Sequence, residues 1–456
     1  MAMVVKNNMP AVNTLNTLNK NESALSKSLQ KVSSGMKINS AGDDASGMAI
    51  SERMRVQVRS LDQDDNNTKN GSALLRTAEG AVQSTIEILK TLKEKAINAA
   101  NDTNTDEDRA VIQKEVDHLI DQIDENALTT YNGKYLIDGS KNGLVVGEGD
   151  GGTRSTYSNM SLGKDTTDTT RLTELKRRDG NALGIHPTDT VTASWVHNGV
   201  SYTGKISPIG NTDIAAMVGI ITGDHAGWYS DTAEIGKDEY GKTVYTPDRQ
   251  PAVTIRADKA GVKQQVSGIT FTITDNRGNL RKEVNAVLDD FREVVRAQNP
   301  SADNALVLQT GVKANQSVKV GFTDMRSAAL GLQSSDGKGW DHGTLGAGIS
   351  VVGSGPKVQV TTQEAANAAI NVFENALIKA TDQMVAIGAA QNRLAFTSSN
   401  LVTASENVQD SESVIRDSDM AKEMTAYTKN NVLTQSAQAM LAQANQNSSA
   451  VLSLLQ

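Results

Sequence analysis

The segment LNTLNKNESALSKSLQKVSSGM, residues 15–36, decides the fold because it carries an apolar seam that needs a partner. Two series of apolar residues in this segment follow a seven-residue repeat. The first series is Leu18, Leu25 and Val32, and the second is Leu15, Leu29 and Met36. Alternating spacings of three and four residues place these side chains on one stripe of a helix, as in a coiled coil. An isolated helix of this length is marginally stable in water, so we expect the stripe to be buried against another helix.

The segment LTQSAQAMLAQANQNSSAVLSL, residues 433–454, carries a matching seam about four hundred residues later. Its two series are Ala437, Ala444 and Val451, and Leu433, Met440 and Leu454. Either segment alone could be an ordinary amphipathic helix on a globular core, but the two together predict that they pair with each other. Glu22 and Asn447 also fall on the seams, where a polar side chain costs stability but disfavours wrong registers.

The composition excludes several classes of protein. The chain has 456 residues, long enough for two to four modules, and its 45 basic residues are outnumbered by 53 acidic ones. This acidic balance argues against a nucleic-acid binder, and the lack of cysteine excludes disulfides and thiolate chemistry. No apolar run approaches the roughly 18 residues of a membrane helix. The first fifteen residues lack the pattern of a cleaved secretory signal, so we expect any export to use another route.

Prolines divide the chain into helical flanks and a different middle. Apart from Pro10, every proline lies between Pro187 and Pro356, so the flanks are free of helix breakers. Apolar residues at helical spacing predict long amphipathic helices over 75–96, 112–127 and 370–394. Thr105 and Asp108 form a capping-box pattern before the second of these helices. We expect the three helices to bundle side by side.

The middle of the chain changes to the alternating pattern of β-strands. In VTASWVHNGVSYTGKI, residues 191–206, Asn198 and Gly199 form a two-residue turn typical of a type I′ hairpin. This turn sets the register of the hairpin, with Trp195 opposite Tyr202 and Val191 opposite Ile206. A further strand is predicted over 266–273, and a short amphipathic helix over 280–295.

Motifs that would indicate catalysis are missing. The five histidines are scattered without the HExxH spacing of a zinc site, and no GxSxG, GxGxxG or P-loop pattern occurs. Asp43 and Asp44 could act as acid and base in principle. They lie in SAGDDASG, however, where small residues favour a tight connection between helices. The glycine-rich segment 147–152 has the composition of a flexible connector. We therefore predict no enzyme activity and no catalytic, cofactor-binding or metal-binding residues.

The segment LQKVSSGMKINSAGDDASGMAISERMR, residues 29–55, resembles the amino-terminal signature of bacterial flagellin. Four further segments resemble other parts of that family in the same order, and they are 128–140, 308–332, 361–394 and 415–446. Together these segments cover somewhat more than half of the chain, so the resemblance is specific.

The resemblance implies an α+β multidomain protein with terminal coiled-coil helices, a helical-bundle rod with a β-hairpin, and a mainly β outer domain inserted in the middle. The terminal module would comprise 1–45 with 410–456, and the rod 46–140 with 306–409. Residues 141–305 would form a variable, surface-exposed outer domain, and 333–360 a second small excursion.

In function, the resemblance implies a secreted structural subunit that self-assembles into the helical bacterial flagellar filament used for swimming motility, outside the cell. The implied partners are further copies of the chain, the flagellar export apparatus with an export chaperone, and the filament cap and junction proteins. Neither nucleic-acid binding nor membrane insertion is implied. Three alternatives remain: a hook-filament junction protein with similar termini, a family member with a peptidase middle, and a generic coiled-coil adhesin. The missing HExxH motif disfavours the peptidase, and the ordered motifs disfavour the adhesin.

A Toll-like receptor recognises many flagellins through a short helical surface, which aligns with LKTLKEKAI, residues 89–97. The candidate recognition residues are Leu89, Thr91, Leu92, Glu94 and Lys95. The recognised type has arginine and leucine at positions 91 and 95, so the resemblance implies weak or no innate immune receptor activation. Lys95 would place an ammonium where an apolar contact belongs. Alternatively, both residues are solvated helix positions that are free to vary.

Overall fold

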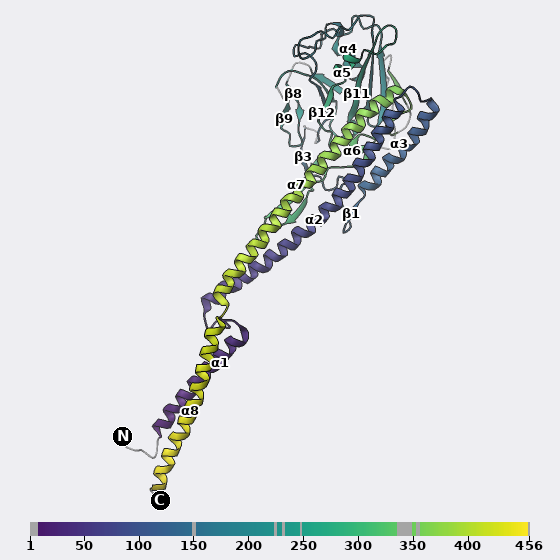
Figure 1. Ribbon diagram of the computed structural model, residues 1–456. Helices are drawn as coiled ribbons and strands as arrows, with labels where there is room; N and C mark the ends of the chain where they lie inside the picture. Colours follow the sequence, from purple (N-terminus) through teal and green to yellow (C-terminus); the bar gives the residue numbers. More distant parts are fainter. Residues whose placement is uncertain are drawn as a thin grey trace. The chain divides into compact units, whose positions relative to one another are not determined.

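The computed structural model describes residues 8–147, 152–222, 226–229, 233–246, 249–334, 349–352 and 356–454 (Figure 1). Within these ranges, the side chains of 222, 226–229, 349–352 and 448–454 are not described. The chain forms two compact units. The first comprises Met1–Lys69, Gln309–Gln316 and Phe396–Gln456, and the second comprises Asn70–Leu308 and Ser317–Ala395.

The first unit contains the terminal helices α1 (Met9–Ser34) and α8 (Met420–Leu454). The Asn8 side chain accepts a hydrogen bond from the first turn of α1, and Pro10 also lies in that turn, where its missing N–H costs nothing. Gly35 ends the helix in the left-handed conformation, with φ 70°, and its N–H donates to the Lys31 carbonyl.

Long helices α2 (Ala45–Ala99) and α7 (Gln363–Arg416) contribute to both units. In the first unit, polar contacts join them: the Ser405 hydroxyl donates to Asp62, and Arg416 donates to Ser51 and Glu52. Both helices extend well beyond the predicted 75–96 and 370–394. Polar residues at buried positions, such as Ser51, weaken the apolar period in the added turns.

In the second unit, α2 and α7 form a rod core with α3 (Asp106–Ala127). The predicted capping box is confirmed, because Thr105 and Asp108 each accept a hydrogen bond from the other's backbone N–H. Short elements flank this core, and they are β1 (Thr130–Tyr131), β2 (Lys134–Tyr135), β14 (Leu306–Gln309), β15 (Ser317–Val320) and α6 (Ser327–Leu330). Strands β14 and β15 pair as the hairpin expected within 308–332.

Two four-stranded antiparallel sheets form what we call the β domain. One has the order β11 (Val266–Thr274), β5 (Thr190–His197), β6 (Val200–Ile206) and β16 (Ile349–Val352), and the other β12 (Phe291–Val295), β4 (Thr156–Asn159), β10 (Val253–Ala257) and β7 (Ala226–Tyr229). Other elements are α4 (Ile214–Thr222), α5 (Lys282–Leu288), η1 (Leu172–Glu174), η2 (Val262–Gln264), and the pairs β3 (Leu144–Val145) with β13 (Ser301–Ala302) and β8 (Glu234–Lys237) with β9 (Thr243–Tyr245). The apolar core of the β domain is a separate cluster from the rod core.

The predicted hairpin at Asn198 and Gly199 is confirmed. Their φ angles are 48° and 77°, as a type I′ turn requires. The predicted register also holds, with Trp195 opposite Tyr202 and Val191 opposite Ile206. The rings of Trp195 and Tyr202 stack with their centroids 5.6 Å apart, which adds a cross-strand contact to the hairpin.

Strand β11 confirms the strand predicted over 266–273, whereas the helix predicted over 280–295 is only half right. Helix α5 ends at Leu288, and the chain continues as β12, which pairs with β4. Just after α5, the Asp289 carboxyl accepts a hydrogen bond from the Phe271 N–H, and burial raises its pKa to about 7. Three of the five residues of β12, FREVV, are aromatic or β-branched, so strand pairing overrides a helical period.

The segment 333–360 leaves and rejoins the rod at a β-bridge between Gln333 and Lys357. Between these points it supplies β16, the edge strand next to β6. The rest of this excursion, 335–348 and 353–355, lies outside the described residues, as does 148–151 of the glycine-rich connector. The proposed three-module division stays a prediction, since the compact units divide at 69/70 and 395/396.

Candidate assembly surfaces

The terminal helices α1 and α8 run antiparallel in contact with each other. Three side-chain hydrogen bonds fix the register: Asn8 Nδ2 donates to the Ala444 carbonyl (3.2 Å), Asn21 Nδ2 to the Leu433 carbonyl (3.3 Å), and Asn430 Nδ2 to Ser28 Oγ (3.0 Å). Near the other end of the pair, the Lys37 N–H donates to the Arg416 carbonyl. Residue numbers thus rise along α1 as they fall along α8.

Each helix turns one heptad face inward, made of buried and half-buried residues. In α1 this inner face is Ala11, Thr14, Leu18, Asn21, Leu25, Ser28 and Val32. In α8 it is Glu423, Tyr427, Asn430, Thr434, Ala437, Leu441 and Ala444. Small and polar residues alternate with aliphatic ones, so the pair buries little apolar area for its length.

The structure brings one predicted series of each seam to the inner face: Leu18, Leu25 and Val32 in α1, with Ala437 and Ala444 in α8. The other series lies outside it, since Leu15, Leu29, Leu433 and Met440 are 45%, 52%, 41% and 61% exposed. Met36 follows α1 and forms a β-bridge with Asp417. The side chains of Val451 and Leu454 lie outside those described.

The polar positions of the inner face also differ from those suggested by the sequence. Glu22 and Asn447 are exposed, each beside the seam instead of in it. Asn21 and Asn430 occupy the seam and hydrogen-bond across it. Asparagine and serine within a helix give no apolar period, so the pattern of hydrophobic residues could not identify this face.

Apolar residues that neither helix buries define the outer apolar set, and they are Met9, Val12, Leu15 and Leu29 of α1, and Met420, Met424, Val432, Leu433 and Met440 of α8. All are more than one third exposed. A concentration of exposed apolar side chains on one helix pair is typical of a protein interaction surface.

The turn between α1 and α2 is held by Asp43 and Asp44 through hydrogen bonds. The Ser40 hydroxyl donates to Asp43, and the Gly47 N–H donates to Asp44. These bonds lower the pKa of both carboxyls, which suits helix capping and not proton transfer. A side chain at Gly47 would approach Asp44 Oδ2 to 2.5 Å, so the turn is closed tightly.

Only some residues of the segment 89–97 of α2, which resembles a receptor-binding surface, are exposed. Leu89 and Leu92 are fully buried in the rod core, so their prediction as surface residues was wrong. Glu94 is exposed, and the Thr91 hydroxyl donates to the Glu87 carbonyl. The Lys95 ammonium lies 2.8 Å from Glu115 Oε2, so it has an ion-pair partner on α3 that the sequence did not reveal.

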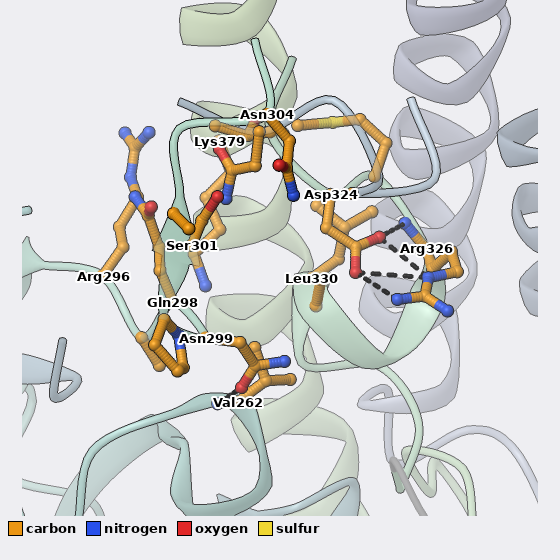
Figure 2. Close-up of a pocket in the computed structure, with 18 residues that line it drawn as sticks. Val262, Arg296, Gln298, Asn299, Ser301, Asn304, Asp324, Arg326, Leu330 and Lys379 are labelled. Atoms are coloured by element: carbon orange, nitrogen blue, oxygen red, sulfur yellow. Dashed lines mark hydrogen bonds and ion pairs between the residues drawn. The ribbon is translucent and has the colours of Figure 1, made fainter. Parts of the chain in front are cut away.

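Figure 2 shows a cavity of about 220 Å³ in the second unit, lined by residues 296–302, 323–326 and Lys379 of α7 among others. Its cations are already paired: Arg326 with Asp324 at 2.6 Å, Arg296 with Asp382, and Lys379 with Glu293 at 3.3 Å. Among the described residues, no group of three or more His, Cys, Asp or Glu could hold a metal ion. The search of those residues for a helix able to cross a membrane also found none.

Comparison with known proteins gives two family matches. Residues 5–142 match "Bacterial flagellin N-terminal helical region", and residues 370–455 match "Bacterial flagellin C-terminal helical region". The protein "Flagellin" of Clostridium tyrobutyricum is 34% identical, covering 97% of this chain and 99% of its own. "Flagellin" of Bacillus subtilis is 28% identical, covering 99% and 100%. The solved structure of FliC from Burkholderia pseudomallei is 17% identical and covers 71% of this chain and 99% of its own, with a TM-score of 0.24.

Proposed function

The chain belongs to the bacterial flagellin family, and we propose that its terminal helices drive filament assembly through the outer apolar set. Flagellins are structural proteins that polymerise into the extracellular flagellar filament, and the present chain is such a subunit. The observation that supports the role of the outer apolar set is the division of each terminal helix. One face pairs within the chain, and positions beside and beyond that face carry apolar side chains that are more than one third exposed.

Assembly through these residues follows from the physics of polymers. A surface that binds a different surface on the next copy generates an open helical filament when the rotation between copies does not close a ring. Burial of exposed Leu, Met and Val side chains by neighbouring copies provides the driving force. The polar inner face leaves α1 and α8 weakly held in the free subunit, so assembly also orders them.

For the organisation of the subunit, we propose a terminal module of 1–45 with 410–456, a rod of 46–140 with 306–409, and an outer domain of 141–305. The chain breaks between α1 and α2 and between α7 and α8 lie close to the boundaries of the terminal module. The separate apolar core of the β domain supports an outer domain that varies independently of the rod.

We further propose that the subunit travels unfolded through the flagellar export apparatus with a chaperone, and then meets the cap and junction proteins. The absence of cysteine supports this route, because no disulfide has to be opened before transport or formed after it. The polar α1–α8 seam supports it too, since little apolar area has to be exposed when the pair separates.

Electron microscopy of the purified protein under polymerising conditions tests the assembly function, and long helical filaments are the expected result. Fluorescent labelling in cells separates this function from that of a junction protein. A filament subunit labels the filament along its whole length, whereas a junction protein labels only its base. Signal confined to the base would contradict the proposal.

Receptor stimulation by this protein is expected to be weak, and Thr91→Arg with Lys95→Leu is expected to raise it several-fold. The double change supplies a planar multidentate donor and releases the ion pair that holds Lys95 against Glu115. A receptor reporter-cell assay measures the response, with the exposed α3 substitution Lys114→Leu as the control. Full potency of the unmodified protein would contradict the expectation.

A further inference from the structure

Helix α7 presents two adjacent lines of residues to its surroundings in the second unit. One line enters the rod core, with Ala366, Ala369, Phe373, Ala376 and Ala380 fully buried. The other line contacts the β domain and consists of Ala368, Val372, Asn375, Lys379 and Asp382. Its first two residues also belong to the rod core cluster. Its spacings of four, three, four and three keep these residues on one side of the helix. We call this second line the docking line.

The first half of the docking line is an apolar contact. Gly268 of β11 approaches α7 so closely that a Cβ there would lie 2.6 Å from Val372 Cγ2 and 2.7 Å from the Ala368 carbonyl oxygen. Among the described residues of strands β4 to β12, only Val196 belongs to the rod core cluster. The apolar attachment of the β domain to the rod is therefore narrow.

The second half of the docking line is polar, with Lys379 buried and Asp382 at its end 55% exposed. Lys379 Nζ lies 3.3 Å from Glu293 Oε1 of β12, and each side chain is only 6% exposed. Asn375 Nδ2 donates to the hydroxyl of Tyr157 in β4 (3.4 Å), and Asp382 pairs with Arg296. Burial lowers the pKa of Lys379, and the Glu293 carboxylate opposes that shift.

Such a pair costs desolvation energy that its Coulomb attraction does not reliably return, so stability alone does not explain it. Its surroundings are also loosely filled. Lys379 lines the cavity of about 220 Å³ in Figure 2, and Glu293, Tyr157 and Asn375 line a second cavity of about 460 Å³. One cavity therefore adjoins Lys379 and the other adjoins Glu293, so unfilled space borders each member of the pair.

We propose that the Glu293–Lys379 ion pair is a latch that selects one orientation of the β domain against α7, with the Gly268 contact as the pivot. A buried ion pair forms only when both strand and helix are in register, so any other tilt leaves two charges uncompensated. The β domain is thereby held at a fixed angle on the rod although its apolar contact is small.

The absence of cysteine from the chain allows a direct test by pulsed electron paramagnetic resonance. Spin labels at Arg277→Cys, in an exposed turn of the β domain, and Ala386→Cys, on the exposed side of α7, report the distance between the two elements. The parent protein is expected to give one narrow distance distribution. Lys379→Met and Glu293→Met, made singly, are expected to lower the denaturation midpoint, because each leaves a buried charge without its partner.

The combined variant Glu293→Met with Lys379→Met distinguishes an effect on the orientation of the β domain from an effect on the stability of the protein. Its denaturation midpoint is expected to return toward that of the parent, while its distance distribution broadens or acquires a second peak. The control is the surface pair Lys93 and Glu374, which also joins α7 to a neighbour at 3.1 Å. Its double Met variant is expected to leave the distribution narrow. A narrow, unshifted distribution in the latch double variant would overturn the proposal, and so would equal broadening in the control.

Discussion

A chain truncated after Val432 is expected to form no filaments, while its second compact unit keeps its fold. The truncation removes Ala437, Leu441 and Ala444 from the inner face of α8, and Met440 from the outer apolar set. Helix α1 then loses its partner, and an isolated helix of this length is marginal in water. Sedimentation and electron microscopy measure assembly in the truncated and full-length chains under the same polymerising conditions.

The truncation spares every residue of the second unit, which gives an internal control. Near-ultraviolet circular dichroism reports the stacked Trp195 and Tyr202 rings of the β domain, and this signal is expected to match that of the full chain. Far-ultraviolet helix content is expected to fall by more than the deleted residues contribute, because α1 melts as well. Normal filaments from the truncated chain would refute the role assigned to α8.

Leu29→Gln combined with Met440→Gln is expected to impair assembly while leaving the helix pair within one chain intact. Both side chains belong to the outer apolar set, and about half of each is exposed. Burying the exposed halves in a filament contributes about 2–3 kcal/mol per subunit, so the critical concentration should rise about 30- to 140-fold. Pelleting assays across a range of protein concentrations measure this quantity.

Matched substitutions on the same helices locate the effect. Lys27→Gln with Gln438→Ser changes two exposed polar positions and is expected to leave the critical concentration unchanged. Leu18→Gln instead places a polar side chain on the inner face. It is expected to lower the helix content of the free subunit and to raise the critical concentration for assembly. If the outer pair of substitutions melted the helices as Leu18→Gln does, the division into inner and outer faces would be wrong.

Local sequence rules were sufficient wherever one short segment determines its own structure. The Asn198–Gly199 turn fixed the hairpin register, and the capping box before α3 needed only Thr105 and Asp108. In each case the deciding backbone conformation or hydrogen bond involves residues within a few positions of one another. The structure of such segments follows from the sequence without knowledge of the rest of the chain.

Features that depend on distant segments were not predictable in this way. Apolar periodicity identified both series of each terminal seam but not which one faces inward, because Asn21 and Asn430 occupy inner positions without an apolar signal. The sequence pattern could not identify the Glu293–Lys379 ion pair either, since these are single charged residues far apart in the chain. The helix predicted over 280–295 failed at β12 because strand β4 supplies its partner from elsewhere.

The close approach of Gly268 to α7 has a consequence for how this protein can diverge. Its φ of 64° disfavours side chains, and the space that a Cβ would need is already occupied by Val372 and the Ala368 backbone. A substitution at position 268 is therefore expected to be selected against unless α7 changes with it. Divergence at this contact requires paired changes in β11 and α7.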